Sequence, residues 1–385
     1  MSLHAEKLAQ ARAALAPGDL WLIAARESGE RPEPGLALVA GLDVTWEAFF
    51  LVTRDEAVAI LGRFDADAVP EGWQVIPYDQ EVQGLLRAEV ARLSPARVLV
   101  NFSPDDPLAD GLTHGLYLRL RDLLPDVKLH SAAAFLGGLR AVKTPGERAA
   151  IREAVTVAED HLAALRGAVR PGWTEAQVAD FLHARCREAG AEPSWGWTAC
   201  PNVHIGPESR PSHAPPEAFA LAPGMLLHID YGVRLASGYC SDIQRSAYLP
   251  MAGEGVPDAV QAAFTACWNA IEAGARALRP GVPGWQVDAA ARASLTASSY
   301  PEYLHALGHG LGRATHDGGT LLAPRWPRYG ALPEGLVRVG EVYTLELGTF
   351  VEGHGFLGLE EDVAVGEDGL DWLSARQNEV FLLGA

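Results

Sequence analysis

The sequence predicts an α+β protein made of two domains, a smaller α/β domain over residues 1–138 and a larger α+β domain over residues 139–385. Three observations predict this class. Short apolar runs alternate with amphipathic segments in the first third, long amphipathic helices begin near residue 140, and the later strand-like runs follow one another closely enough to form hairpins. A chain of 385 residues, 48% of them hydrophobic, can fill two cores of ordinary size.

The first domain opens with a charged amphipathic pattern over residues 1–19 and continues with short apolar runs bounded by turn residues. Such runs predict strands, and apolar residues spaced three and four apart predict helices. The predicted strands are 20–25, 35–42, 48–53, 57–62, 73–79 and 96–102, and the predicted helices are 81–93 and 113–125. Because no glycine-rich phosphate loop follows a strand, this domain by itself predicts no particular chemistry.

The second domain begins where Pro145 suits the first turn of a helix and Thr144 suits its cap. Helical spacing then alternates with strand-like runs. The predicted helices are 140–169, 174–190, 257–278 and 282–299, and the predicted strands are 224–231, 238–248, 341–349 and 358–365. Hairpins, rather than parallel crossovers, therefore surround the acidic residues of this domain, which favours α+β.

Charge and composition exclude several classes of partner. The formal net charge is -18, so the surface repels nucleic-acid phosphates and anionic lipid, and neither nucleic acid nor membrane is expected as a partner. The N-terminus lacks the apolar segment of a signal peptide, and no stretch approaches the length of a membrane span. The four cysteines form no CxxC pair and are expected to be small buried residues or free thiols. We therefore expect a cytoplasmic protein.

Two carboxylates interrupt segments that otherwise predict buried strands. Asp230 ends an apolar run, and Asp242 follows within "CSDIQR". A tight hairpin centred on Ala236, with the loop 235–237 and a positive φ at Gly238, would put the two aspartates directly opposite each other. Because an unpaired buried carboxylate costs several kcal/mol, the pair needs a partner such as a divalent cation.

Later segments contain further residues that could bind a cation. The histidines lie in "HALGHGLGRATH", one glutamate lies in the apolar strand "VYTLELG", and three acids lie in "LEEDV". These candidates are His305, His309, His316, Glu346, Glu360, Glu361 and Asp362. Two aspartates, one histidine and two glutamates suit two Mn²⁺, Co²⁺ or Zn²⁺ ions better than one structural zinc.

Each of these residues also has a plainer interpretation. A single aspartate after an apolar strand is usually a turn residue, a histidine among glycines is usually a loop residue, and three acids in a row usually form a solvated surface. The alternation of side chains along the last strand also does not decide which of its two glutamates points inward. Glu361 shares its face with Val363 and Val365, and Glu360 does not.

The order of five motifs resembles the "pita-bread" metallopeptidases of the creatinase/methionine aminopeptidase superfamily, and within it the prolidase and aminopeptidase P branch. The motifs are "IDYG", "SDIQR", "GHGLGRATH", "LELG" and "LEEDV". The resemblance covers the C-terminal domain, and the N-terminal domain and "VKTPGE" resemble the branch more weakly. It implies a creatinase-type α/β domain followed by a pita-bread catalytic domain.

The resemblance also implies a set of site residues. It favours Glu360 over Glu361 and gives the metal ligands as Asp230, Asp242, His309, Glu346 and Glu360. It implies two divalent ions, first Mn²⁺, with Co²⁺ or Zn²⁺ as alternatives. The catalytic residues that it implies are His213 and His316, which contact the substrate carbonyl, and Glu346, which carries a proton from water to the leaving nitrogen.

The function that the resemblance implies is hydrolysis of the Xaa-Pro bond in dipeptides or short peptides by a homodimeric Xaa-Pro dipeptidase (prolidase). The alternative is a Xaa-Pro aminopeptidase (aminopeptidase P) that acts on longer peptides. A catalytically inactive pita-bread protein used for binding is a third hypothesis, which the complete set of ligands argues against.

Two departures from the family pattern concern substrate binding. Leu235 stands where a tyrosine is common, and Gly358 stands where an arginine is common. The group that would bind a dipeptide's carboxylate is therefore open, with Arg210 and Arg313 as candidates. His354, between the last two ligands, is a further candidate for filling the gap, although a loop histidine is the plainer interpretation.

Overall fold

The computed structural model describes residues 1–28, 33–209 and 215–384. The chain divides into two compact units, Met1–Arg140 and Ala141–Ala385. Among the residues so described, no helix has the length and apolar character needed to cross a membrane.

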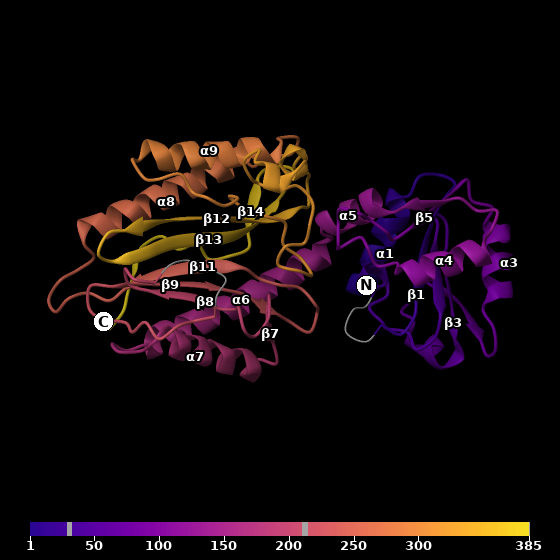
Figure 1. The fold of residues 1–385 in the computed structure, drawn as a ribbon, viewed down its shortest axis with the longest axis horizontal. Helices are drawn as coiled ribbons and strands as arrows, with labels where there is room; N and C mark the ends of the chain where they lie inside the picture. Colours follow the sequence, from indigo (N-terminus) through magenta and orange to yellow (C-terminus); the bar gives the residue numbers. More distant parts are fainter. Residues whose placement is uncertain (29–32, 210–214, 385) are drawn as a thin grey trace. The chain divides into compact units, whose positions relative to one another are not determined.

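The first unit is a mixed sheet covered on both faces, with strand order β4-β3-β2-β1-β5-β6. Strands β1, β2 and β3 pair antiparallel, and the other neighbours are parallel. Helices α1, α2 and α5 pack on one face of the sheet, and α3 and α4 pack on the other (Figure 1). The strands are β1 (Asp19–Ala25), β2 (Ala48–Val52), β3 (Ala57–Gly62), β4 (Gln74–Tyr78), β5 (Arg97–Val100) and β6 (Leu129–Ser131). The helices are α1 (Leu3–Ala14), α2 (Pro34–Val39), α3 (Gln83–Leu93), α4 (His114–Leu123) and α5 (Ala133–Ala141).

One predicted strand of this unit is wrong. Residues 35–42 contain the short helix α2 instead, because Pro34 occupies its first turn and the Glu33 carboxylate accepts a hydrogen bond from Leu36 N at 2.7 Å. A short continuous apolar run fits a buried strand and a buried helix equally well, so its periodicity could not decide between them.

The second unit is a sheet with strand order β12-β13-β11-β9-β8, extended by β14 on β13 and β15 on β11. Helices α8 and α9 pack along β12 and β13, whereas α6 and α7 pack along β8 and β9 (Figure 1). The strands are β7 (Glu192–Pro193), β8 (Asn202–Ile205), β9 (Leu226–Tyr231), β10 (Val233–Arg234), β11 (Ile243–Tyr248), β12 (Val342–Val351), β13 (Gly355–Val365), β14 (Leu370–Trp372) and β15 (Phe381–Leu382). The helices are α6 (Pro145–Ala168), α7 (Glu175–Glu188), α8 (Asp258–Ala277) and α9 (Gly284–Ala297).

Both helix pairs pack on the same face of this sheet. Odd-numbered residues such as Ile229, Leu345 and Leu359 point into the cores under the helices. Side chains alternate along a strand, so the even-numbered residues of the same strands point to the other face. That second face carries Asp230, Glu346 and Glu360.

The helix at the start of this unit begins as predicted. Thr144 caps α6 and Pro145 occupies its first turn. The Thr144 hydroxyl accepts from Glu147 N at 3.2 Å, and the Glu147 carboxylate accepts from Thr144 N at 2.7 Å. This reciprocal capping satisfies two backbone donors that the helix itself leaves unpaired.

Candidate metal centre

A row of polar side chains crosses the open face of the sheet from β8 to β12. Directly paired residues of antiparallel strands point to the same face, so the members of this row are neighbours. From β8 to β12 the row is Asn202, Asp230, Gln244, Glu360 and Glu346. Three of the five predicted metal ligands therefore lie in one line across strands that are far apart in the sequence.

The second aspartate does not lie directly opposite the first. Asp230 pairs with Gln244, which follows Asp242 by two residues. Asp242 itself lies just before the first residue of β11. The hairpin is centred on Ser237 rather than Ala236, because the three-residue loop is 236–238 and Gly238 takes its positive φ of 83° inside that loop. A shift of the centre by one residue moves the pairing by two, so the two aspartates stay on one face as diagonal neighbours.

The predicted histidine ligand, His309, comes from a segment that runs beside β12. The backbone of His309 exchanges hydrogen bonds with Thr344, whose N donates to His309 O at 3.0 Å and whose hydroxyl accepts from His309 N at 3.3 Å. The ring Nε2 of His309 lies 3.6 Å from Asp242 Oδ2 and 3.9 Å from Glu346 Oε1. The ring Nδ1 faces Gly310 O at 3.4 Å, which leaves the Nε2 lone pair directed at the acids.

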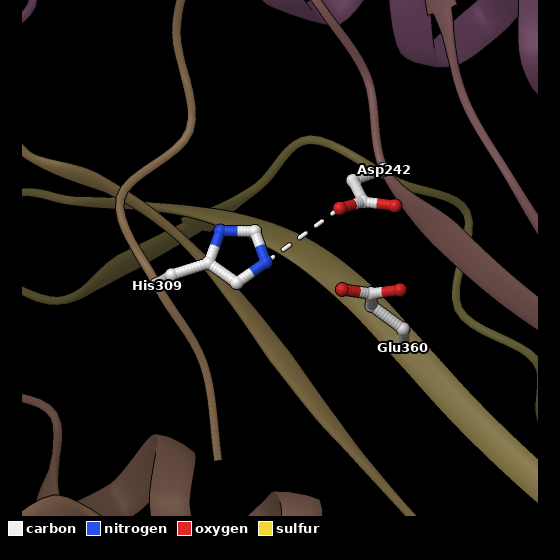
Figure 2. Close-up of side chains that lie close together, drawn as sticks. All are labelled: Asp242, His309 and Glu360. Carbon is white, nitrogen blue, oxygen red and sulfur yellow. Dashed lines mark ion pairs between the residues drawn. The ribbon is translucent and has the colours of Figure 1, made fainter. Parts of the chain in front are cut away.

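Asp242, His309 and Glu360 form the tightest group. One ligand atom from each lies within 4.8 Å of the other two, and all three side chains are buried (Figure 2). Figure 2 shows the imidazole of His309 facing the two carboxylates across a small space. This separation is what a divalent ion bound by all three residues requires.

The electrostatics of the site favour added positive charge. Burial raises the pKa of Asp230 to about 6 and that of Glu346 to about 8. Burial and the neighbouring carboxylates hold the pKa values of Asp242 and Glu360 well above their usual range. Burial also lowers the pKa of His309 to about 3, so its ring is neutral and can donate a lone pair. Four clustered carboxylates cannot all be ionised together unless cations bind among them.

A buried atom without a partner supports the same conclusion. Asp230 Oδ1 has no hydrogen-bond partner among the described residues, although it is buried. A buried carboxylate oxygen normally has one, so the lone pairs of this oxygen are free to bind a cation. The oxygen-rich donor set with one imidazole fits divalent metal ions.

The two adjacent glutamates of β13 point to opposite faces. Glu360 lies in the polar row, whereas Glu361 lies on the helix side of the sheet. There Glu361 binds the guanidinium of Arg245 at 3.1 Å and accepts hydrogen bonds from Ser374 Oγ at 2.6 Å and Gln377 N at 2.9 Å. Glu361 therefore has its own complete set of partners away from the metal centre.

Of the two histidines predicted to contact the substrate, only His316 lies among the residues that the structure describes. The ring of His316 lies edge-on to that of His309, with centroids 4.3 Å apart, and the His316 side chain is exposed. His213 lies outside the described residues, as does Arg210. His305 instead lies against the ring of Tyr303, with centroids 5.6 Å apart.

Two further candidates lie elsewhere. Arg313 packs on the tip of the hairpin, where its guanidinium lies over the ring of Tyr239 at 5.4 Å and donates to Ser237 O at 3.4 Å. His354 lies in the turn between β12 and β13, and its Nδ1 contacts Gly224 O at 2.7 Å. His354 is thus a loop histidine in the turn that follows β12.

Sequence reasoning missed strand β8 and two residues next to the ligands. Gln244 lies in the polar row, and His228 bonds to it. The alternation of strands was the signal that could have found them. His228 precedes Asp230 by two positions and Gln244 follows Asp242 by two positions, so each shares a face with a ligand.

A buried ion pair holds the segment that carries His309 and His316. Lys143 Nζ lies 3.0 Å from Asp317 Oδ2, and the two side chains are 1% and 4% exposed. The other oxygen of Asp317 accepts from Ala314 N at 3.3 Å, and Asp317 N donates to Gly310 O at 2.8 Å. The segment 310–317 is therefore tied to the residue that precedes the cap of α6.

Comparison with known proteins decides the family. The sequence pattern of metallopeptidase family M24 matches residues 149–367, which is more than half of the chain. The chain belongs to metallopeptidase family M24. This M24 peptidase has the mixed α and β fold that the sequence predicted, with a pita-bread C-terminal domain.

Similar proteins agree with this assignment. This M24 peptidase is 26% identical over 275 residues to an uncharacterized peptidase of Bacillus subtilis, an alignment that covers 71% of this chain and 73% of the relative. It is 27% identical over 244 residues to the Xaa-Pro dipeptidase of Pyrococcus furiosus, which covers 63% of this chain and 66% of that enzyme.

Solved structures share the fold along nearly the whole chain. An X-Pro aminopeptidase from Thermotoga maritima superposes with a TM-score of 0.79 at 22% identity, covering 97% of this chain and 100% of the other. A Xaa-Pro dipeptidase from Bacillus anthracis gives 0.77 at 21% identity, covering 99% and 100%. At these identities the likeness is one of fold.

Proposed function

We propose that this M24 peptidase is a Xaa-Pro dipeptidase that uses two divalent metal ions. The observation that carries the proposal is the convergence of five side chains at one face of the sheet, where four carboxylates have raised pKa values. Asp242, His309 and Glu360 are buried, and Asp230 and Glu346 are partly buried. The named activity of the relative from Pyrococcus furiosus supports proline-containing dipeptides as the substrate class.

The proposed ligands suit two neighbouring ions. Asp242, His309 and Glu360 would hold one ion with Glu346, and Asp230 would join Asp242 and Glu360 on the other. Mn²⁺ is our first choice because four of the five ligands are carboxylates, and Co²⁺ and Zn²⁺ are the alternatives. When bound, a pair of such ions supplies an acidified water and polarises the scissile carbonyl.

The side chains of the protein supply the remaining steps. The carboxylate of Glu346, whose Oε1 lies 3.9 Å from His309 Nε2, would take a proton from the attacking water and pass it to the leaving nitrogen of proline. His316 lies beside His309 and would donate a hydrogen bond to the substrate carbonyl oxygen as negative charge develops there. His213 is proposed for the same role from the other side.

One observation favours the alternative activity, a Xaa-Pro aminopeptidase on longer peptides. A dipeptidase must bind the free carboxylate of its substrate, and Gly358 supplies no side chain for this purpose. Arg313, which could have replaced the missing arginine, packs against the hairpin tip instead. An open end to the substrate site would admit longer peptides.

The deciding experiment is hydrolysis by Mn²⁺-loaded protein of a Xaa-Pro dipeptide beside the matching Xaa-Pro-Xaa tripeptide. Chelation of the metal should abolish cleavage, and restoring Mn²⁺ should recover it. Cleavage mainly of the dipeptide supports the proposal, and cleavage mainly of the tripeptide supports the aminopeptidase. If protein with bound Mn²⁺ cleaves neither peptide, both proposed activities are contradicted.

A homodimer is proposed on the resemblance alone. Light scattering after size exclusion measures the mass directly, and a mass of one chain, 41.0 kDa, would contradict the proposal.

A further inference from the structure

A second row of residues lies beside the row of proposed ligands. It crosses the sheet on the same face and contains two histidines, a serine and two glycines. From β8 to β12 these are His204, His228, Ser246, Gly358 and Gly348. Because the two glycines have no side chains, they leave space next to Glu360 and Glu346. Side chains from neighbouring strands fill this space.

The space beside Gly358 is filled by Gln244 and His228. A Cβ atom at position 358 would lie 2.6 Å from His228 Nε2 and 2.7 Å from Gln244 Oε1, closer than such atoms approach in folded proteins. Any side chain at this position would therefore displace the glutamine, the histidine or both. Glycine is needed here for close approach rather than for an unusual backbone conformation.

These two side chains form a chain of hydrogen bonds that ends on a proposed ligand. His228 Nε2 lies 3.0 Å from Gln244 Oε1, and Gln244 Nε2 donates to Glu346 Oε2 at 2.9 Å. The direction of these hydrogen bonds follows if Glu346 is ionised, as a metal ligand is. An ionised glutamate only accepts, so the amide nitrogen of Gln244 faces Glu346, and its oxygen accepts from the N–H of His228.

Packing holds this chain in place. The His228 ring stacks on that of His204 with centroids 5.6 Å apart and meets the edge of Phe356 at 4.9 Å. Gln244 is 5% exposed and His228 3%. With both neighbours fixed, the amide of Gln244 has one favourable orientation.

We propose that Gln244 is a positioning residue for Glu346, and that Gly358 makes room for it. By holding Oε2, Gln244 leaves Glu346 Oε1 facing the ring of His309, where the lone pair of that oxygen can reach a metal ion. The inference rests on the proposed function, because it assumes that Glu346 is a metal ligand and proton carrier. It also gives a physical reason for glycine at a position where the family commonly has arginine.

The test compares metal affinity and catalysis in matched variants. Gln244→Met keeps the length of the side chain and removes the donor, and Gly358→Ala adds one carbon where it would displace Gln244. Gly255→Ala is the control, because a Cβ there meets nothing within 4 Å. Each protein is titrated with Mn²⁺ by calorimetry, its Co²⁺ absorption spectrum is recorded, and kcat and KM are measured on the peptide that the wild type cleaves.

We expect Gln244→Met and Gly358→Ala each to weaken Mn²⁺ binding or lower kcat by about 10–100-fold, the usual effect of removing a group that orients a metal ligand. KM should change much less than kcat, the Co²⁺ spectrum should shift, and Gly255→Ala should match the wild type. Because both substitutions act on the same bond, Gln244→Met combined with Gly358→Ala should cost little more than the worse single variant.

Several results would overturn the inference. One is a folded Gln244→Met protein whose Mn²⁺ affinity, Co²⁺ spectrum and kcat all equal those of the wild type. If that variant fails to fold, the same three results in Gly358→Ala would overturn the inference. Additive losses in the double variant would also contradict a shared mechanism. A wild-type protein that binds no Mn²⁺ would overturn the proposed function itself, and this is seen before any variant is made.

Discussion

At the scale of single residues, the face of a strand decides which acids can act. Glu360 and Glu361 are neighbours in sequence, yet Glu360 joins the polar row and Glu361 binds Arg245 on the opposite face. Asp230 and Asp242 share a face although they are not paired directly. The chemistry of each carboxylate therefore follows from its position in the pleat rather than from its residue type.

The first prediction concerns Asp242, which lies near both proposed ions. Asp242→Ala should lose bound metal and nearly all activity, because it removes a carboxylate 3.6 Å from His309 Nε2. Asp368→Ala is the matched control, because Asp368 is exposed in a turn between β13 and β14. Metal content after dialysis and kcat/KM check both variants. Full activity in Asp242→Ala would refute the assignment of this residue as a ligand.

The second prediction concerns Glu33 in the first unit. Burial raises its pKa to about 7 from an ordinary value of 4.5, despite hydrogen bonds from Asn101 and Leu36 N. The folded state therefore binds the proton more tightly than the unfolded state. The stabilisation is present below about pH 4.5 and is lost as the pH rises through about 7.

Thermal unfolding of the wild type and Glu33→Gln between pH 4.5 and 8 measures this effect. The difference in Tm between the two proteins should change steadily across that range, because the variant has no proton to lose at this position. A difference that stays constant with pH would show that Glu33 does not titrate there.

At the scale of elements, the metal centre depends on how loops are tied to the sheet. His309 is held by backbone bonds to Thr344 of β12, and the segment that follows it is held by the buried pair Lys143–Asp317. The hairpin between β9 and β11 sets the offset of the two aspartates through the length of its loop. Small changes in connecting segments would therefore move ligands that lie on rigid strands.

The third prediction follows from the buried pair. Lys143→Met leaves the Asp317 carboxylate buried without its cation, and removing one partner of such a pair costs about 3–5 kcal/mol. Lys128→Met, which changes an exposed lysine, should leave stability nearly unchanged. Chemical denaturation of both variants gives the free energies of unfolding. Equal values for the two would show that the pair adds nothing to stability.

Adding Asp317→Leu to Lys143→Met separates charge from packing. Without the aspartate, no uncompensated charge remains, so the double variant should regain part of the lost stability. A double variant less stable than Lys143→Met would show that the segment depends on the hydrogen bond from Ala314 N to the Asp317 carboxylate instead.

At the scale of the whole molecule, the acidic centre makes the metal-free protein pay an electrostatic cost. Asp230, Asp242, Glu346 and Glu360 all have raised pKa values, so each is forced toward its protonated form by burial. Cations bound among them relieve this cost only in the folded state. Metal binding should therefore stabilise the fold as well as provide activity.

The fourth prediction measures that coupling. Mn²⁺ at about one hundred times its Kd should add about 2.7 kcal/mol, which corresponds to roughly 5–10 °C in Tm for a unit of this size. Calorimetric scans with Mn²⁺ and with chelator give the shift, and Asp242→Ala serves as control because it should show little of it. If Mn²⁺ raises the Tm of the wild type and of Asp242→Ala equally, the stabilising ion binds outside the proposed centre.

The sequence determined the cap of α6 and the long amphipathic helices, because these depend on residue type and local spacing. It also supplied the candidate ligands and their order along the chain, with the family resemblance choosing Glu360 over Glu361. It misassigned residues 35–42, where a short apolar run fits two structures, and it missed β8 altogether.

Only the tertiary structure decided that Gln244 bonds to Glu346, that Asp230 is diagonal to Asp242, and that His309 lies against β12. The strand order β12-β13-β11-β9-β8 brings together residues more than one hundred positions apart, such as Gln244 and Glu346. Local periodicity specifies the face that each residue occupies. The neighbour that it meets across that face depends on hairpin register and strand order, which are set by the folding of the whole sheet.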